Sequence, residues 1–227
     1  MKKNIQSVIL LLVFSFPFIC FSQEQEVKTE TDPKIVKIRP IRIGAKVGFP
    51  NIIGGNIEYV TPVLNNKLGF NLDYSQIKSD WLGMDNEEEY GDKTSNFDFR
   101  YIEPGISFYF FKPGKGLYTL LSYGMFQVDG TIRDVSHFED SDLKGTGTID
   151  LSHNSFNVKL GAKLGGLFYF RPEVGYSFNS LPQSAHMDVL YEDGSRERKS
   201  YEFEAEGTPY SPLFSGLNAN LGIGFAF

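Results

Sequence analysis

Cysteine, tryptophan and histidine are scarce in this chain of 227 residues, which holds one Cys, one Trp and three His. The single cysteine, Cys20, lies in an apolar N-terminal segment, so the rest of the chain excludes disulfides, thiol nucleophiles and cysteine metal sites. Basic residues number 22 against 28 acidic ones. This acidic balance argues against a nucleic-acid partner, which would require basic stripes. A mean hydropathy of −0.22 is too low for a helical membrane protein.

Recognised catalytic motifs are also lacking. The sequence has no nucleophile elbow, no phosphate-binding loop and no dinucleotide fingerprint. It contains no pattern that predicts a cofactor. An acidic run over residues 85–92 has no ordered ligand spacing, so we interpret it as a solvated loop and predict no metal site. On these grounds we expect a protein that is not an enzyme.

The N-terminal segment has the composition of a signal peptide. Lys2 and Lys3 precede an apolar stretch over residues 8–21, which is shorter than a spanning helix requires. We predict a signal peptide over residues 1–22 and a flexible periplasmic leader over residues 23–40. The alternatives are a retained helical anchor, and lipidation of Cys20, although bulky Phe18 and Ile19 precede it instead of small residues.

From residue 41 onward, apolar residues alternate with polar or small ones, the pattern of strands with one apolar face. We predict eight strands, over residues 41–49, 53–61, 68–75, 97–111, 117–129, 156–164, 168–178 and 217–227. The apolar parity flips across Glu103-Pro104-Gly105, which predicts a β-bulge there. Pro172 predicts a local irregularity. In residues 117–129 the pattern leaves the inward face undecided.

The connections differ in length in a regular way. Short turns are predicted between the second and third, fourth and fifth, and sixth and seventh strands. Polar loops are predicted over residues 77–96, 130–147 and 179–212, the last containing a hairpin signal at Glu192-Asp193-Gly194-Ser195. Short turns on one rim and long loops on the other are typical of an outer-membrane barrel.

An apolar face on every strand predicts a closed antiparallel up-and-down β-barrel in lipid, because hydrocarbon cannot satisfy the open edge of a sheet. Charged residues that alternate with the apolar ones must then face the lumen, where opposite charges can form ion pairs. A lumen of about eight strands is filled by side chains. The residues predicted to form this lumenal charge network are Lys46, Glu58, Asp73, Arg100, Lys159, Lys163, Arg171 and Glu173.

The final strand ends in the alternating apolar residues Leu221, Ile223, Phe225 and Phe227. This ending is similar to the C-terminal insertion signal of Gram-negative outer-membrane barrels, and residues 41–227 as a whole resemble the small, eight-stranded members of that family, which have adhesive and structural roles. The resemblance implies a structural or surface-interaction role in the outer membrane, with both termini periplasmic. It also implies contact with outer-membrane lipid and lipopolysaccharide, and with the barrel-assembly machinery during insertion. Tyr59, Tyr74, Tyr101, Tyr118 and Tyr176 are candidates for aromatic girdles.

Three alternatives remain open at the level of sequence. A soluble β-sandwich or a lipocalin-like cup would also show alternation. A narrow ion-conducting pore would use the same lumenal charges. An outer-membrane lipid A-modifying hydrolase is the third, because His153 and Ser155 form a His-x-Ser pair similar to that of a lipid A deacylase family, and Glu173 on the next strand could orient the histidine.

Overall fold

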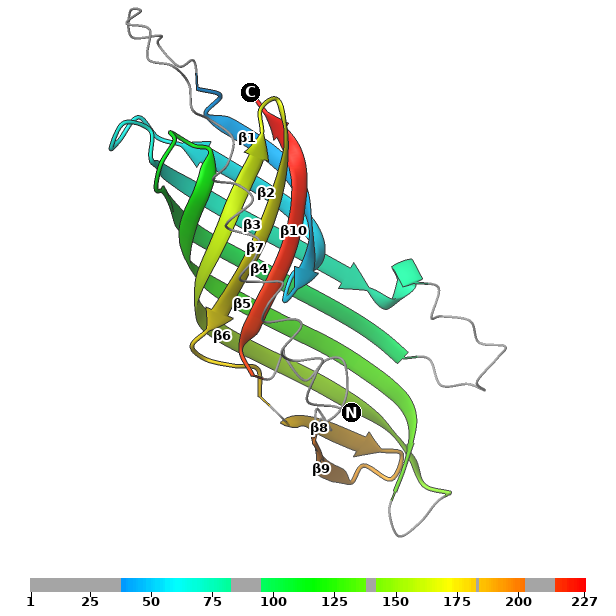
Figure 1. Cartoon of the computed structure of the whole chain (residues 1–227). Helices are drawn as coiled ribbons and strands as arrows, with labels where there is room; N and C mark the ends of the chain where they lie inside the picture. Colours follow the sequence, from blue (N-terminus) through cyan, green and yellow to red (C-terminus); the bar gives the residue numbers. More distant parts are fainter. Residues whose placement is uncertain (1–37, 83–94, 138–141, 183, 203–214) are drawn as a thin grey trace, which may run out of the picture. The chain divides into compact units, whose positions relative to one another are not determined.

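The computed structural model describes residues 38–82, 95–137, 142–182, 184–202 and 215–227. The predicted signal peptide, nearly all of the leader and the acidic run over residues 85–92 lie outside the described residues. Ten strands and one short 3-10 helix are described (Figure 1): β1 (Ile41–Phe49), β2 (Ile52–Val60), β3 (Leu68–Lys78), η1 (Ser79–Leu82), β4 (Ser95–Tyr109), β5 (Gly116–Ser136), β6 (Lys144–Gly165), β7 (Phe168–Ser177), β8 (Ser184–Tyr191), β9 (Arg196–Glu202) and β10 (Leu217–Ala226). None of these described segments is a helix long and apolar enough to cross a membrane.

Eight of the strands close into an antiparallel barrel. The order β5-β4-β3-β2-β1-β10-β7-β6 is closed by pairing between β5 and β6, and the first strand pairs with the last through Arg42↔Ala226 to Phe49↔Ala219. Closure leaves no unpaired sheet edge around the ring, as lipid requires. The prediction of an all-β, closed, eight-stranded barrel is confirmed.

The barrel rims differ as the sequence predicts. One rim carries the chain's C-terminal residue and the short turns that join β2 to β3, β4 to β5 and β6 to β7. At this rim the start of β1 contacts the C-terminal residue, because the Phe227 N–H donates to the Ile41 carbonyl at 2.8 Å. The longer connections follow β3, β5 and β7 on the other rim.

Three strands continue well past the long-loop rim. β5 extends to Ser136 and β6 begins at Lys144, so the prediction of a polar loop over residues 130–147 is wrong. The prediction takes polar composition as the sign of a loop, but strands outside a membrane need no apolar outer face and can be equally polar. The register between β5 and β6 shifts only between Ile132 and Val135.

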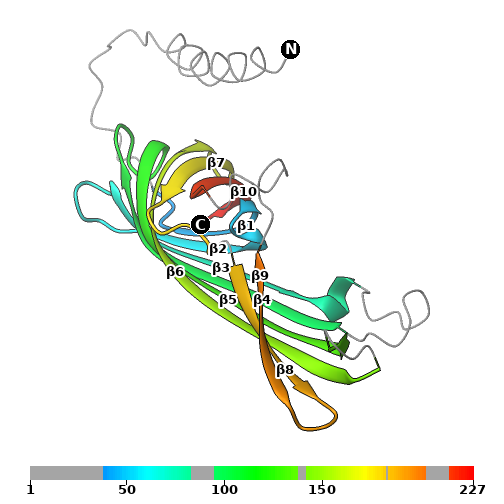
Figure 2. The ribbon, with the colours of Figure 1, turned by 90° about the horizontal axis from the view of Figure 1, so that it is seen from below.

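The hairpin predicted at residues 192–195 is present and extends this sheet. β8 pairs with Gly145–Ile149 of β6, and β9 pairs with β8. One strand, β6, therefore pairs with β7 through its C-terminal half and with β8 through its N-terminal half. Figure 2 shows β4, β5 and β6 running out from the closed ring, and the β8–β9 hairpin is paired with β6. We call this part, outside the ring, the extended sheet.

Pro104 in β4 and Pro172 in β7 each interrupt the pairing with a neighbouring strand without changing its register. The pairing of β4 with β5 skips Glu103 and Pro104, yet Ile102↔Met125 and Gly105↔Ser122 keep one register. The predicted bulge at residues 103–105 is therefore absent, and the same parity faces inward along all of β4. Near Pro172, pairing between β6 and β7 likewise skips two positions in constant register, which confirms the predicted irregularity.

Candidate functional site: the barrel interior and the extended sheet

The outside of the closed ring is an apolar belt. Leu72, Leu121, Leu160, Val174 and Leu221 are each about half exposed, as are most of the large apolar side chains that alternate with buried polar ones. A soluble monomer rarely exposes so large a continuous apolar surface to water. The chain is therefore a β-barrel membrane protein by the polarity of its surfaces, with an apolar exterior and a charged interior.

Aromatic side chains gather at both ends of the belt. Phe110, Phe111, Phe168, Phe225 and Phe227 lie exposed near the short-turn rim, and Tyr74, Tyr123, Tyr176 and Phe178 lie exposed toward the long-loop rim. Tyr59 is also exposed, near the short-turn rim. The girdle prediction is wrong for Tyr101 and Tyr118, which are buried inside the barrel at 1% exposure each.

The belt ends within one row of the same level on neighbouring strands. Tyr74, Ile102 and Met125 pair in one row with Asn154 of β6, where the last apolar outward residue, Phe156, lies one row further in. In the following row, Gln76↔Arg100↔Gln127↔Ser152, every outward position is polar. The next row outward is Lys78↔Asp98↔Asp129↔Asp150. This change marks where hydrocarbon contact ends along β3, β4, β5 and β6.

The inner face changes in the opposite sense at the same level. Phe99 packs edge-on against Phe126 with ring centroids 5.2 Å apart. Further out, Met187, Val189 and Tyr191 of β8 form a buried cluster against Ile132, Val135, Leu143 and Ile149. The extended sheet therefore has an apolar inner face and a polar outer face, the reverse of the barrel wall. The burial pattern of β5 gives the facing that the sequence left undecided for residues 117–129: Tyr118, Leu120, Ser122 and Gly124 face inward.

Inside the ring, the middle layer is a balanced ion-pair network. Lys46 contacts both Asp73 and, at 2.6 Å, Glu173. Arg171 contacts Glu173 at 2.6 Å and donates to Asn56 at 2.8 Å, and Tyr118 donates to Glu173 at 2.5 Å. These charged side chains are at most 2% exposed, and each has an opposite charge in contact.

A second pair lies beside this network toward β4, β5 and β6. The Lys159 ammonium is 2.5 Å from Glu103, whose carboxylate also accepts from Ser122 and Asn157. Both charged side chains are fully buried. The sequence prediction missed Glu103, because the assumed bulge placed it in an irregular segment.

Near the short-turn rim, two cations share one carboxylate. Glu58 contacts Lys163 and lies 3.1 Å from Arg42, and it accepts a 2.6 Å hydrogen bond from Tyr109. The Lys163 ammonium also lies 5.0 Å from the centre of the Tyr169 ring, in the range of a cation–π contact. The sequence prediction missed Arg42, although its place between Ile41 and Ile43 fitted the alternation.

Of the predicted lumenal charges, the structure brings together Lys46, Glu58, Asp73, Lys159, Lys163, Arg171 and Glu173 inside the barrel. Arg100 is the exception, and its assignment to the lumen is wrong. It lies between the inward Phe99 and Tyr101, its side chain is 41% exposed, and its contact is Asp98 at 3.8 Å on the outer face. The lumenal assignment of Arg100 assumes a flip of parity at residues 103–105, and β4 has no such flip.

The short-turn mouth of the lumen is closed by protein. Val60, Tyr109, Tyr118 and Leu120 form a buried cluster, and Ile38 packs against it. The turn after β4 folds over the same mouth, since Arg42 donates to the Gly114 carbonyl at 2.5 Å. Gly114 is buried with φ of +58°, a conformation that disfavours other residues.

The His153, Ser155 and Glu173 side chains do not form a relay. The Ser155 hydroxyl donates to Asn157 at 3.0 Å, and His153 Nε2 lies 3.1 Å from the Asn179 carbonyl oxygen. Glu173 is held by Arg171, Lys46 and Tyr118 in the middle layer. A cavity of about 20 Å³ beside His153 and Ser155 has room for about one water molecule.

The predicted insertion residues Leu221, Ile223, Phe225 and Phe227 all lie on the outer face of the last strand, about half exposed or more. Their role in insertion stays a prediction. Among the residues that the structure describes, no group of three or more His, Cys, Asp and Glu side chains is placed to hold a metal ion.

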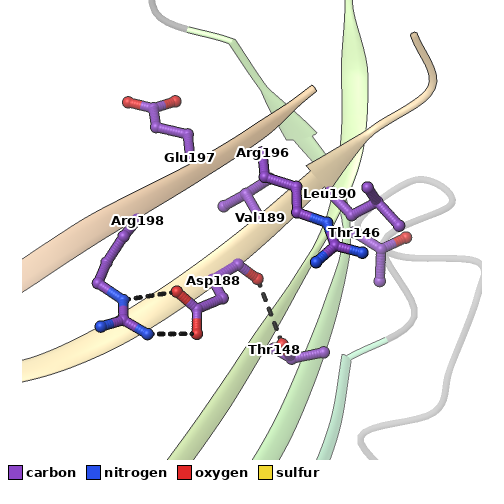
Figure 3. Close-up of a pocket in the computed structure, with 8 residues that line it drawn as sticks. All are labelled: Thr146, Thr148, Asp188, Val189, Leu190, Arg196, Glu197 and Arg198. Atoms are coloured by element: carbon purple, nitrogen blue, oxygen red, sulfur yellow. Dashed lines mark hydrogen bonds and ion pairs between the residues drawn. The ribbon is translucent and has the colours of Figure 1, made fainter. Parts of the chain in front are cut away.

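A groove of about 620 Å³ lies on the outer face of the extended sheet (Figure 3). Cross-strand register builds it from two rows, Thr148↔Asp188↔Arg198 and Thr146↔Leu190↔Arg196. Arg198 binds Asp188 through two hydrogen bonds of 2.7 and 3.0 Å. The hydrogen bond from Arg198 lowers the pKa of Asp188, so this exposed ion pair persists to lower pH than a free aspartate would allow.

No protein-family model matches the chain, and no curated protein matches it. Several solved structures have a similar chain path. CarO of Acinetobacter baumannii is 15% identical with a TM-score of 0.43, the match covering 83% of this chain and 98% of that one. CarO2 of the same organism is 12% identical with a TM-score of 0.40, covering 84% and 100%. A major outer membrane protein from Thermus thermophilus is 14% identical with a TM-score of 0.40, covering 82% and 97%.

Proposed function

We propose that this protein is an integral outer-membrane β-barrel whose role is structural or surface-interacting, without catalysis and without bulk transport. The apolar belt with an aromatic girdle at each end is the observation that carries the proposal. A closed antiparallel barrel with short turns on one rim and long connections on the other is the arrangement of outer-membrane barrels. On this account the short-turn rim and both termini are periplasmic.

The filled lumen supports the part of the proposal that concerns transport. Its middle is occupied by paired charges, and its periplasmic mouth is closed by Ile38, Val60, Leu120 and the turn at Gly114. A substrate would have to displace buried ion pairs, and an unpaired buried charge is strongly unfavourable. A barrel of eight strands leaves little interior volume beyond its own side chains.

The extended sheet supports a role at the cell surface. It reaches beyond the apolar belt on three neighbouring strands and carries a hairpin of its own. Its polar outer face and apolar inner cluster are those of a water-exposed sheet. A protein with only an anchoring role would need no such extension, so we infer that this part contacts something outside the membrane.

Site-directed surface proteolysis tests the location and orientation together. We insert a specific protease site between Asp193 and Gly194 in the exposed β8–β9 turn, and place a matched site between Lys115 and Gly116 in the short turn before β5. In intact cells, cleavage is expected only at the hairpin, and at both sites after lysis. Folded protein should run faster on a gel before boiling than after. Cleavage only at the Lys115 site in intact cells, or recovery of the protein in the soluble fraction, would refute the proposal.

A further inference from the structure

The groove on the extended sheet carries two arginines and two acidic residues, and both acidic side chains already have partners. Its charged side chains are Arg196, Arg198, Asp188 and Glu197, and Glu197 is engaged by the Tyr191 hydroxyl at 2.6 Å and by Lys199 at 3.5 Å. Arg196 is exposed, and Figure 3 shows its guanidinium lying beside Thr146 and Leu190 without a bond to the other residues drawn. Guanidinium groups bind phosphate through paired N–H donors, which makes arginine the preferred residue for that anion.

Arg198 is held in position by the groove itself. Asp188 engages its Nε and one terminal nitrogen, leaving the other terminal nitrogen available to a ligand. The Thr148 hydroxyl donates to the Asp188 carbonyl at 3.3 Å, which ties β8 to β6 at this point. A pre-positioned donor loses less conformational entropy when it binds than a free side chain does.

The groove lies on the face that continues the lipid-facing wall. Thr148 is eight residues beyond Phe156 on the same face of β6. Eight residues span about 27 Å along a strand, and a tilt of 35–45° places them about 19–22 Å beyond the belt edge. A molecule that packs around the barrel in the outer leaflet therefore presents its head group, not its acyl chains, at this height.

The aspartates at Asp98, Asp129 and Asp150 lie between the belt and the groove and would repel a phosphate. Asp150 is four residues from Thr146 along β6, or about 14 Å. Charges farther apart than about 10 Å are largely screened at 0.1 M salt. The row containing Arg196 is therefore largely free of this repulsion, and Arg198 in the next row adds the terminal nitrogen that Asp188 does not engage.

We propose that this groove binds a phosphate group on the oligosaccharide of outer-leaflet lipopolysaccharide, with Arg196 and Arg198 as the binding residues. The proposal rests on the proposed outer-membrane function, since only there would the groove face that lipid. Arg196 and the terminal nitrogen of Arg198 that Asp188 does not engage supply donors for the phosphate, and Thr146 supplies a hydroxyl for the sugar.

Fluorescence anisotropy tests the proposal on the full chain in detergent, with labelled lipopolysaccharide carrying a phosphorylated core and the same lipopolysaccharide after removal of its core phosphates. The double variant Arg196→Gln, Arg198→Gln is compared with Lys115→Gln, which removes an exposed charge on the opposite rim. We expect the double variant to bind the phosphorylated form at least tenfold more weakly, and Lys115→Gln to change affinity less than twofold. The dephosphorylated form should bind the parent protein as weakly as the double variant binds the phosphorylated one.

Equal affinity of parent and double variant would overturn the proposal. So would a loss of affinity that persists on the dephosphorylated form, an equal loss in Lys115→Gln, or no measurable binding by the parent. Gel mobility before boiling and surface cleavage at residues 193–194 are measured on the same variants. Because they report folding and location, failure of the phosphate site is distinguishable from failure of the outer-membrane assignment.

Discussion

Replacing Glu58 by Gln is expected to destabilise the barrel by about 3–5 kcal/mol, the cost of leaving a buried charge without its partner. Glu58 contacts two cations, Arg42 and Lys163, and all three side chains are buried. Glutamine keeps the shape of the side chain but cannot neutralise either cation. The free energy of unfolding is measured by urea titration in lipid vesicles, with gel mobility before boiling as the signal of folding.

Two further variants separate charge from general damage. Glu192→Gln, in the exposed β8–β9 turn, should change the free energy of unfolding by less than about 0.5 kcal/mol. Adding Lys163→Met to Glu58→Gln should recover part of the loss, because one of the two unpaired cations is then removed. If Glu58→Gln is as stable as the parent protein, the lumenal pairing contributes little and this account of the interior is wrong.

Replacing Leu160 by Arg is expected to cost about 2–4 kcal/mol, the penalty for a cation on the lipid face near the middle of a membrane. Leu160 lies midway between Phe156 and Leu164 on the outer face of β6 and is 48% exposed. Exposure to water would make such a substitution nearly neutral, so the size of the effect reports on the surrounding medium. The same urea titration in vesicles measures it.

The matched control lies on the same strand and the same face. Ser152 is eight residues from Leu160 and two rows of β6 past the last belt residue, Phe156. Ser152→Arg should therefore change stability by less than about 0.5 kcal/mol. Equal effects of the two arginines would mean that the outer face of β6 meets one medium along its whole length, against the polarity reversal described above.

The barrel could be predicted from sequence because, within the membrane, contact with hydrocarbon determines which side chains of every strand face outward. Lys46, Glu58, Asp73, Lys159, Lys163, Arg171 and Glu173 alternate with apolar residues, and hydrocarbon on one side forces them all to the other. The eight strands, the alternation of short and long connections and the β8–β9 hairpin follow from the same pattern and from turn residues.

The errors cluster where contact with hydrocarbon ends. Aromatic character predicts Tyr101 on the outside, and charge predicts Arg100 on the inside. These residues lie at the edge of the belt, where water surrounds the outer face and apolar side chains are better buried within. Polarity alone cannot show where along a strand that change occurs. The register across β3, β4, β5 and β6 locates it, and register is a property of the folded sheet.

The same limit explains the missed extension and the missed groove. Residues 130–136 and 144–147 are polar enough to resemble a loop, and only pairing between β5 and β6 makes them strand. The groove combines side chains from β6, β8 and β9, whose contact depends on which strand the hairpin joins. Sequence spacing within each segment contains no information about that choice.

The account depends most directly on hydrocarbon contacting one face of β6 from Phe156 to Leu164 and water contacting that face beyond it. A spin label placed at each position from 146 to 164, one per variant with Cys20 replaced, measures collision with membrane-dissolved oxygen and with a water-soluble nickel complex. We predict high oxygen accessibility at even positions from 156 to 164, high nickel accessibility at even positions from 146 to 152, and low values of both at odd positions from 155 to 163. Uniform accessibility without the two-residue period, or nickel contact throughout the even positions, would contradict it.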